Sequence, residues 1–194
     1  MSRAHPALTP EHQQFRDTVR RFVDKELAPH VAAWDEAGEF PRALYRKAAE
    51  AGLLAVGFPE QYGGIEADLF FHVILSEEIA RAGAGGVSAS LFSHGIGAPP
   101  IARVGSEELR GRVLPQILAG EKISALAITE PSGGSDVAQL RTRADRDGGD
   151  YLINGEKSFI TSGMRADYYT VAVRTGGPGA AGLSLVLVRS LAGF

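Results

Sequence analysis

The sequence predicts an α+β fold in which helices fill residues 1–121 and strands fill residues 122–194. Apolar residues recur with helical spacing as far as Leu118, and beyond Lys122 short apolar runs with a period of two replace them. Gly120 is a plausible helix stop between the two patterns. Helices followed by strands are typical of an α+β arrangement. We expect a β domain that is partial and barrel-like, because the sequence ends where a domain of this kind should still need strands to close.

The helical part is predicted to contain five helices. Thr9 and Pro10 supply an N-cap and a first-turn proline for the first helix, and Pro29 is expected to kink or end it. The basic run from Arg16 to Lys25 lies largely off the apolar stripe of this helix, so we interpret it as a solvated face. The remaining helices are expected to begin at Pro41 and to span residues 68–81, 87–104 (with a bend at Pro99-Pro100) and 107–118.

The β part is predicted from apolar runs and turn residues. A first strand over residues 123–128 should end near Glu130, because Pro131 cannot donate to a sheet ladder. Asn154-Gly155 is a strong type I′ hairpin signal, so residues 151–153 and 156–161 are predicted to pair across it. Two more strands are expected over residues 168–173 and 183–188.

Composition excludes several classes of function. The 194 residues carry 20 basic and 23 acidic side chains, a net charge of −3, which gives no electrostatic signature of nucleic-acid binding. The sequence has no cysteine, which excludes disulfides, thiolate metal sites and a cysteine nucleophile. We expect no metal site, because His94 stands without other ligands at a suitable spacing. No apolar run reaches the roughly 18 residues of a membrane span. No secretory signal is visible, so a cytoplasmic location is expected.

Two polar segments after predicted strands form the candidate binding region. In the first, residues 129–136, Gly133 and Gly134 are expected to allow backbone conformations that a Cβ forbids, and main-chain N–H groups can form an anion-accepting concavity. The second, residues 159–161, places an aromatic ring and a hydroxyl on one face of its predicted strand. Together the segments can line one wall of a flat aromatic ligand. On the residues alone, the first segment can also be a simple strand end and polar loop, and Phe159 a core residue.

Both segments resemble motifs of the acyl-CoA dehydrogenase family. Residues 127–136, Ala-Ile-Thr-Glu-Pro-Ser-Gly-Gly-Ser-Asp, resemble its first signature, and Phe159-Ile160-Thr161 looks like its Trp-Ile-Thr flavin motif at the expected distance downstream. Pro59-Glu60-Gln61-Tyr62-Gly63-Gly64 looks like a further loop of the same family. The resemblance covers nearly the whole chain. Two linked motifs at a fitting separation are more specific than either motif alone.

The resemblance implies an FAD-dependent enzyme that oxidises an acyl-CoA thioester to its trans-2-enoyl form. It implies that Thr129 hydrogen-bonds the flavin ring, that Thr161 bonds near its N5 atom, and that Ser135 also contacts the substrate. Phe159 replaces the usual tryptophan, so the indole N–H donor is lost. Gln139 stands where the signature has a small residue. The residues expected at the cofactor are Leu126, Ala127, Ile128, Thr129, Gly134, Ser135, Phe159, Ile160 and Thr161.

The resemblance places the catalytic base in a C-terminal helical domain, so no catalytic residue is expected within this sequence. Glu130 and Asp136 are interpreted as scaffold residues. We therefore expect weak FAD binding and little turnover by this chain alone, as for an N-terminal domain with a partial middle domain. An electron-transferring flavoprotein is the implied electron acceptor, and a homodimer or homotetramer the implied assembly. Two alternatives stay open: a flavin monooxygenase or nitroalkane-oxidising relative, and an inactive module that binds acyl-CoA or a partner.

Overall fold

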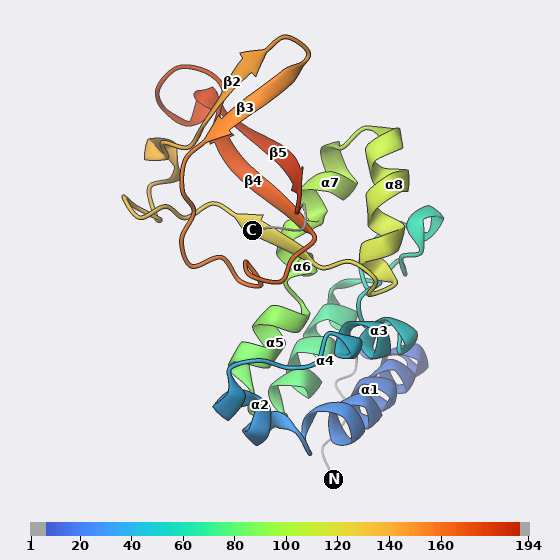
Figure 1. Cartoon of the computed structure of the whole chain (residues 1–194). Helices are drawn as coiled ribbons and strands as arrows, with labels where there is room; N and C mark the ends of the chain where they lie inside the picture. The colour runs from blue at the N-terminus through green and yellow to red at the C-terminus, as the bar shows by residue number, and fades with distance from the viewer. Residues whose placement is uncertain (1–6, 191–194) are drawn as a thin grey trace. The chain divides into compact units, whose positions relative to one another are not determined.

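The computed structural model describes residues 7–190, as helices followed by a sheet, and so confirms the α+β prediction (Figure 1). The expectations about the N-terminal residues 1–6 and the last residues 191–194 lie outside this described part. The residues form two compact units, one of residues 7–92 and 107–121 and the other of residues 93–106 and 122–190. Residues 93–106, which the sequence placed with the helices, therefore group with the strands. The domain boundary at residue 121 stays a prediction.

The helical unit contains six α-helices. Thr9 caps the first helix through a hydrogen bond from the His12 N–H, as the sequence predicted. The run then continues as a π-helix, Val23–Leu27, and ends just before Pro29. No helix of residues 7–190 combines the length and the apolar character that crossing a membrane requires. The helices are α1 (Pro10–Phe22), α2 (Val31–Ala37), α3 (Ala43–Glu50), α4 (Leu69–Ala80), α5 (Gly85–Leu91) and α8 (Glu107–Leu118).

A buried carboxylate joins α1 to α4 and corrects one interpretation of the sequence. Glu78 is 1% exposed and accepts hydrogen bonds from Arg16 (2.9 Å), Arg20 (2.7 Å) and Arg81 (2.9 Å). The bond from Arg20, with those from Arg16 and Arg81, lowers the pKa of Glu78 from 4.5 to about 2 despite the opposing effect of burial. Assigning Arg16 to a solvated face was wrong, because its side chain is only 18% exposed. Arg20 also binds Glu78 but is exposed, as the interpretation of a solvated face expected.

The single helix predicted over residues 87–104 is also wrong, because the structure divides it into three short helices. Two of these belong to the second unit, α6 (His94–Gly97) and α7 (Pro99–Val104). The restart at Pro99 follows the prediction, since proline cannot donate to the preceding turn. Gly97 allows α6 to lie against the sheet: a Cβ there would come within 2.7 Å of the Ser124 hydroxyl and 2.8 Å of the Ala125 carbonyl carbon.

The second unit is built on a five-stranded sheet. Its central strand β4 pairs in parallel with β1 and β2 and antiparallel with β5, while β3 pairs only with β2. One core cluster contains Ala127, Ala144, Val171 and Val173. The two C-terminal strands lie where the sequence predicted them, within a residue. The strands are β1 (Ser124–Ala127), β2 (Arg143–Asp147), β3 (Asp150–Asn154), β4 (Tyr168–Arg174) and β5 (Leu183–Arg189).

The predicted hairpin around Asn154-Gly155 is absent, and the prediction was wrong. Asn154 is the last residue of β3 and pairs with Arg143 of β2, so the hairpin is β2–β3. Its two-residue loop is Gly148-Gly149, and Gly148 has the positive φ of 59° that a primed turn needs at its first position. Gly155 instead lets the chain pass close to Thr142, because a Cβ on Gly155 would lie 2.5 Å from the Thr142 hydroxyl. Residues 156–161 form no strand.

Candidate functional site

The loop after β1 is closed by a tight turn. The Glu130 N–H donates to the Gly133 carbonyl (3.0 Å), and the Gly133 N–H donates to the Glu130 carbonyl (3.1 Å). Pro131 occupies the second position of this turn, where its fixed φ is favourable. Neither Gly133 nor Gly134 has a positive φ, so the prediction that this loop needs glycine conformations was wrong. A Cβ on Gly134 would lie 3.4 Å from the Thr129 methyl group, which is an ordinary van der Waals contact.

Glu130 connects this loop to the chain before β2. The side chain is 5% exposed and accepts hydrogen bonds from the Arg141 N–H (2.7 Å), the Thr142 N–H (2.8 Å) and the Thr142 hydroxyl (2.6 Å). Burial alone would raise the pKa of Glu130, but these bonds and one from Lys157 outweigh it and lower the pKa from 4.5 to about 2. A carboxylate held in this way is a poor proton acceptor, which agrees with its interpretation as a scaffold residue.

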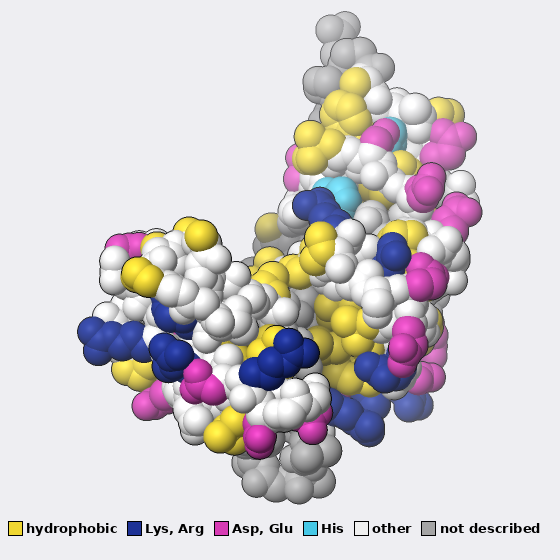
Figure 2. All heavy atoms as spheres, turned by 90° about the horizontal axis from the view of Figure 1, so that it is seen from above, with side chains coloured by type: hydrophobic (Ala, Val, Ile, Leu, Met, Phe, Trp, Pro, Cys, Tyr) yellow, Lys and Arg dark blue, Asp and Glu magenta, His cyan; other side chains and the backbone are white. Residues whose placement is uncertain are grey.

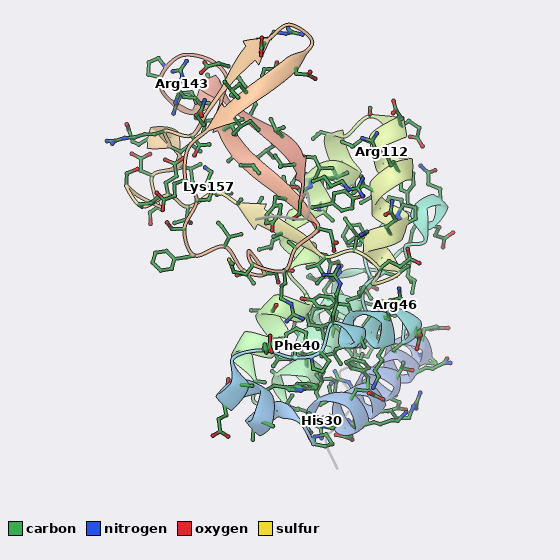
Figure 3. The ribbon with its side chains drawn as sticks, viewed as in Figure 1. His30, Phe40, Arg46, Arg112, Arg143 and Lys157 are labelled. Carbon is green, nitrogen blue, oxygen red and sulfur yellow. The ribbon has the colours of Figure 1, made fainter. Side chains whose placement is uncertain are left out.

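Lys157 joins the second candidate segment to the first. Its ammonium group donates to the Ile128 carbonyl and to the Glu130 carboxylate, each at 2.9 Å. One residue further, the Ser158 N–H donates to the Thr129 carbonyl at 2.9 Å. Figure 3 places Lys157 beside the segment that leaves β1. These bonds bring the two candidate segments together although about 28 residues separate them. The ion pair between Lys157 and Glu130 could not be predicted from the sequence.

The segment of residues 159–162 has an unusual backbone conformation. Phe159 has a φ of 57° and Ser162 a φ of 63°, and they are the only non-glycine residues of the described chain with positive φ. A bulky residue in this region is strained. Phe159 is also 95% exposed, so it is not a core residue. The Thr129 and Thr161 hydroxyls have no hydrogen-bond partner within residues 7–190, and thus both are available to a ligand.

The other predicted residues differ in accessibility. Ala127 is buried in the sheet core, so only its main chain can reach a ligand. Leu126, Ile128 and Ile160 are half-buried, and Gly134 and Ser135 are exposed on the loop. Sequence reasoning missed three structural members of the site, Arg141, Thr142 and Lys157. The described residues contain no cluster of His, Cys, Asp and Glu that can hold a metal ion.

Comparisons with known proteins identify matches over most of the chain. The family model "Acyl-CoA dehydrogenase, N-terminal domain" matches residues 9–121, and "Acyl-CoA dehydrogenase, middle domain" matches residues 125–194. The long-chain specific acyl-CoA dehydrogenase, mitochondrial, of Sus scrofa is 43% identical over 183 residues, which is 93% of this chain and 42% of that protein.

Solved structures show the same relationship. An acyl-CoA dehydrogenase structure from Mycobacterium smegmatis is 54% identical, with a TM-score of 0.91, over 94% of this chain and 48% of that one. A glutaryl-CoA dehydrogenase from the same organism, in complex with FADH2, is 33% identical with a TM-score of 0.86 over 94% and 46% of the two chains. The chain therefore spans about half the length of these relatives. Because the two family models together match most of its residues, the chain belongs to the acyl-CoA dehydrogenase family.

Proposed function

We propose that this chain carries one wall of an FAD site and takes part in the α,β-dehydrogenation of an acyl-CoA thioester to the trans-2-enoyl product. The observation that supports this most strongly is the hydrogen bond between Ser158 and Thr129, which joins the two motif segments. The Phe159 ring is exposed, and the Thr129 and Thr161 hydroxyls have no hydrogen-bond partner among residues 7–190.

The chemistry of these groups fits a flavin. An isoalloxazine ring offers a flat apolar face and a polar rim, and the motif segments supply an aromatic ring and two hydroxyls. FAD, when bound, supplies a hydride acceptor for the β-hydrogen of the thioester. The role of the chain would be to orient that acceptor: Thr129 and Thr161 would hydrogen-bond its rim, and Phe159 would cover it. Exposed Ser135 stands on the same loop as Thr129, a suitable place for contact with the acyl-CoA.

We assign the general base to residues outside 7–190. The reaction requires removal of an α-proton by a group that is basic near neutral pH. Glu130 is unsuitable, because its hydrogen bonds lower its pKa to about 2 and occupy its oxygens. We keep as proposals an electron-transferring flavoprotein as acceptor, a homo-oligomeric assembly and a cytoplasmic location.

The flavin wall can be tested by FAD titration of the 194-residue chain, followed by quenching of flavin fluorescence. Thr129→Ala and Thr161→Ala should each weaken binding by about 5- to 10-fold, the usual effect of one lost hydrogen bond. Thr18→Ala, which removes an exposed hydroxyl from α1, should leave affinity unchanged and serves as the control. Equal affinity in all three variants would contradict the assignment of the wall.

The reaction can be tested with acyl-CoA. Under anaerobic conditions an acyl-CoA thioester should bleach the flavin band only slowly, because we assign the general base to residues outside 7–190. Slow bleaching supports dehydrogenation, and fast bleaching would contradict the assignment of the base. Oxygen consumption with reduced flavin would favour the monooxygenase-like alternative. Thermal stabilisation by acyl-CoA without any flavin reduction would favour the inactive module.

A further inference from the structure

Strand β3 is an unprotected edge of the sheet. Within residues 7–190 it pairs only with β2. Figure 1 shows the β2–β3 hairpin extending beyond the ends of β4 and β5. The sequence of β3, Asp-Tyr-Leu-Ile-Asn, contains neither lysine nor proline, and its unbroken register with β2 leaves no bulge. Edge strands of soluble proteins usually carry one of these devices, because unpaired N–H and C=O groups otherwise accept a strand of another chain.

The main-chain groups of Tyr151 and Ile153 point away from β2. The two-residue hairpin loop is closed by the pair Asp147–Asp150, and a pair in this position exchanges hydrogen bonds. Hydrogen-bonded and non-hydrogen-bonded pairs alternate along an antiparallel ladder, so Tyr151 and Ile153 belong to the pairs that turn their N–H and C=O groups outward. These groups form no hydrogen bond with another residue of the described chain. The outer side of β3 thus offers one donor and one acceptor from each of the two residues.

β3 also exposes apolar side chains. Leu152 is 59% exposed and Tyr151 is 47% exposed. Ile153 packs against the core cluster of the sheet, so the alternation along the strand places Leu152 on the opposite face. Hydrophobic side chains reach the surface in several separate places on the face that Figure 2 shows, so exposure alone identifies no binding surface. An exposed leucine between two residues with free main-chain groups is a more specific feature, because strand addition uses both.

We propose that β3 pairs with β3 of a second copy of this chain, antiparallel and across a twofold axis. The outward groups of Tyr151 and Ile153 must bond to the same groups of the second copy, which restricts the possible registers. Only the register centred on Leu152 leaves all five residues of each strand paired. Twofold contacts of this kind are self-complementary, and they are the commonest assembly of identical chains. The two sheets then join into one continuous sheet.

The residues that lie opposite each other in this register suit a pair of identical strands. Leu152 faces its own copy in a non-hydrogen-bonded pair, where side chains approach most closely, so two exposed leucines cover each other. Tyr151 faces Ile153, an aromatic and β-branched pair that stabilises sheets. Asp150 faces Asn154, whose amide can donate to the carboxylate, and no two like charges meet. The proposal goes beyond the proposed function, because it names a surface for association and involves no residue of the flavin wall.

The first test is sedimentation equilibrium of the 194-residue chain over a range of concentrations. The unchanged chain should associate weakly into dimers, because the contact is small. Leu152→Lys should lower the association constant by about 10-fold or more, since two lysines would face each other across the axis. Within one copy the same lysine would lie opposite Asp145 of β2, which favours the hairpin, so misfolding would not explain the loss.

Leu185→Lys is the matched control for this substitution. Leu185 is a 49% exposed leucine of β5, which within residues 7–190 pairs only with β4. The substitution adds the same charge to the other edge of the sheet and should leave the association constant unchanged.

The second test uses the absence of cysteine from the sequence. In Leu152→Cys, the two thiols would face each other across the axis with Cα atoms about 4.5 Å apart, within the range of a disulfide. Oxidised glutathione should therefore give a covalent dimer that a thiol reductant separates. In Tyr151→Cys, the two thiols would lie two residues apart along the strands, about 7 Å in addition to the gap between strands, which is too far to bridge. This variant should give no covalent dimer.

Several results would overturn the proposal. They are the absence of concentration-dependent association of the unchanged chain, equal association of Leu152→Lys and the unchanged chain, and equal yields of covalent dimer from Leu152→Cys and Tyr151→Cys. A loss of association in Leu185→Lys alone would assign the contact to β5 and would also overturn it. FAD titration of Leu152→Lys should give the affinity of the unchanged chain, because β3 contributes no residue to the flavin wall, so the two proposals fail independently.

Discussion

The ion pair of Glu130 and Lys157 should decide whether the two motif segments stay together. Lys157→Met removes one of the four hydrogen bonds to the Glu130 carboxylate and leaves a buried charge without its counter-ion. Breaking a buried pair from one side costs about 3–5 kcal/mol of unfolding free energy. Glu130→Gln should cost about as much. The double variant should cost less than the sum, because neither partner is then left alone.

The pH dependence gives an independent magnitude. The pKa of Glu130 falls from 4.5 to about 2, and about 2.5 pKa units correspond to about 3 kcal/mol. Because the folded state lowers the pKa, this stabilisation is fully present above about pH 4.5 and is lost as the pH falls toward 2. In Glu130→Gln, the sheet unit should lose this part of its acid sensitivity.

Hydrogen exchange read by mass spectrometry suits this test, because a single unfolding curve of a two-unit chain is hard to interpret. Peptides covering residues 126–131 and 155–161 should exchange faster in Lys157→Met at pH 7, while peptides of α1 and α4 stay protected. The reasoning would be refuted if both segments were as well protected in Lys157→Met as in the unchanged chain. It would also be refuted if Glu130→Gln and the unchanged chain lost protection equally below pH 4.5.

The other predictions concern separate parts of the molecule. Glu78→Gln should destabilise the helical unit by about 3 kcal/mol, because it leaves the arginines that bind Glu78 without their shared acid. Trp34 fluorescence in urea reports the unfolding of this unit, and an unchanged unfolding midpoint would contradict the prediction. Gly97→Ala should lower the stability of the sheet unit by about 1–2 kcal/mol through overpacking against Ser124, measured by its exchange rates; a gain in stability contradicts it. Phe159→Gly should raise the melting temperature, by relief of about 1 kcal/mol of strain, yet weaken FAD binding; parallel changes of both contradict it.

Local signals predicted most of the helices and strands. Thr9 and Pro10 start α1 as expected, and the apolar runs give β4 and β5 within a residue. Signals of this kind act over a few residues, so the sequence displays them directly. α2 was missed because it begins after a proline with no side-chain cap, and its Trp34 packs near Phe40. Tertiary contacts of this sort are invisible to local reasoning.

The hairpin error has a comparable cause. Asn154-Gly155 and Gly148-Gly149 are both acceptable turn sequences, and local preference favours the first. The structure selects the second, because β3 pairs with β2 and Gly155 must pass close to Thr142. Thr142 in turn is fixed by Glu130. A contact between residues more than ten positions apart therefore decides which turn forms.

The backbone strain at Phe159 is explained better by function than by stability. Phe159 gains little from burial, since it is 95% exposed, and its φ of 57° costs free energy. The fold gains nothing from a side chain that is exposed and strained, so binding of a ligand explains this residue better than packing does. Lys157 and Ser158, just before it, supply the bonds that hold the strained segment in place. A buried ion pair thus stabilises a backbone that the local sequence would not adopt, and the proposed flavin wall depends on that pair.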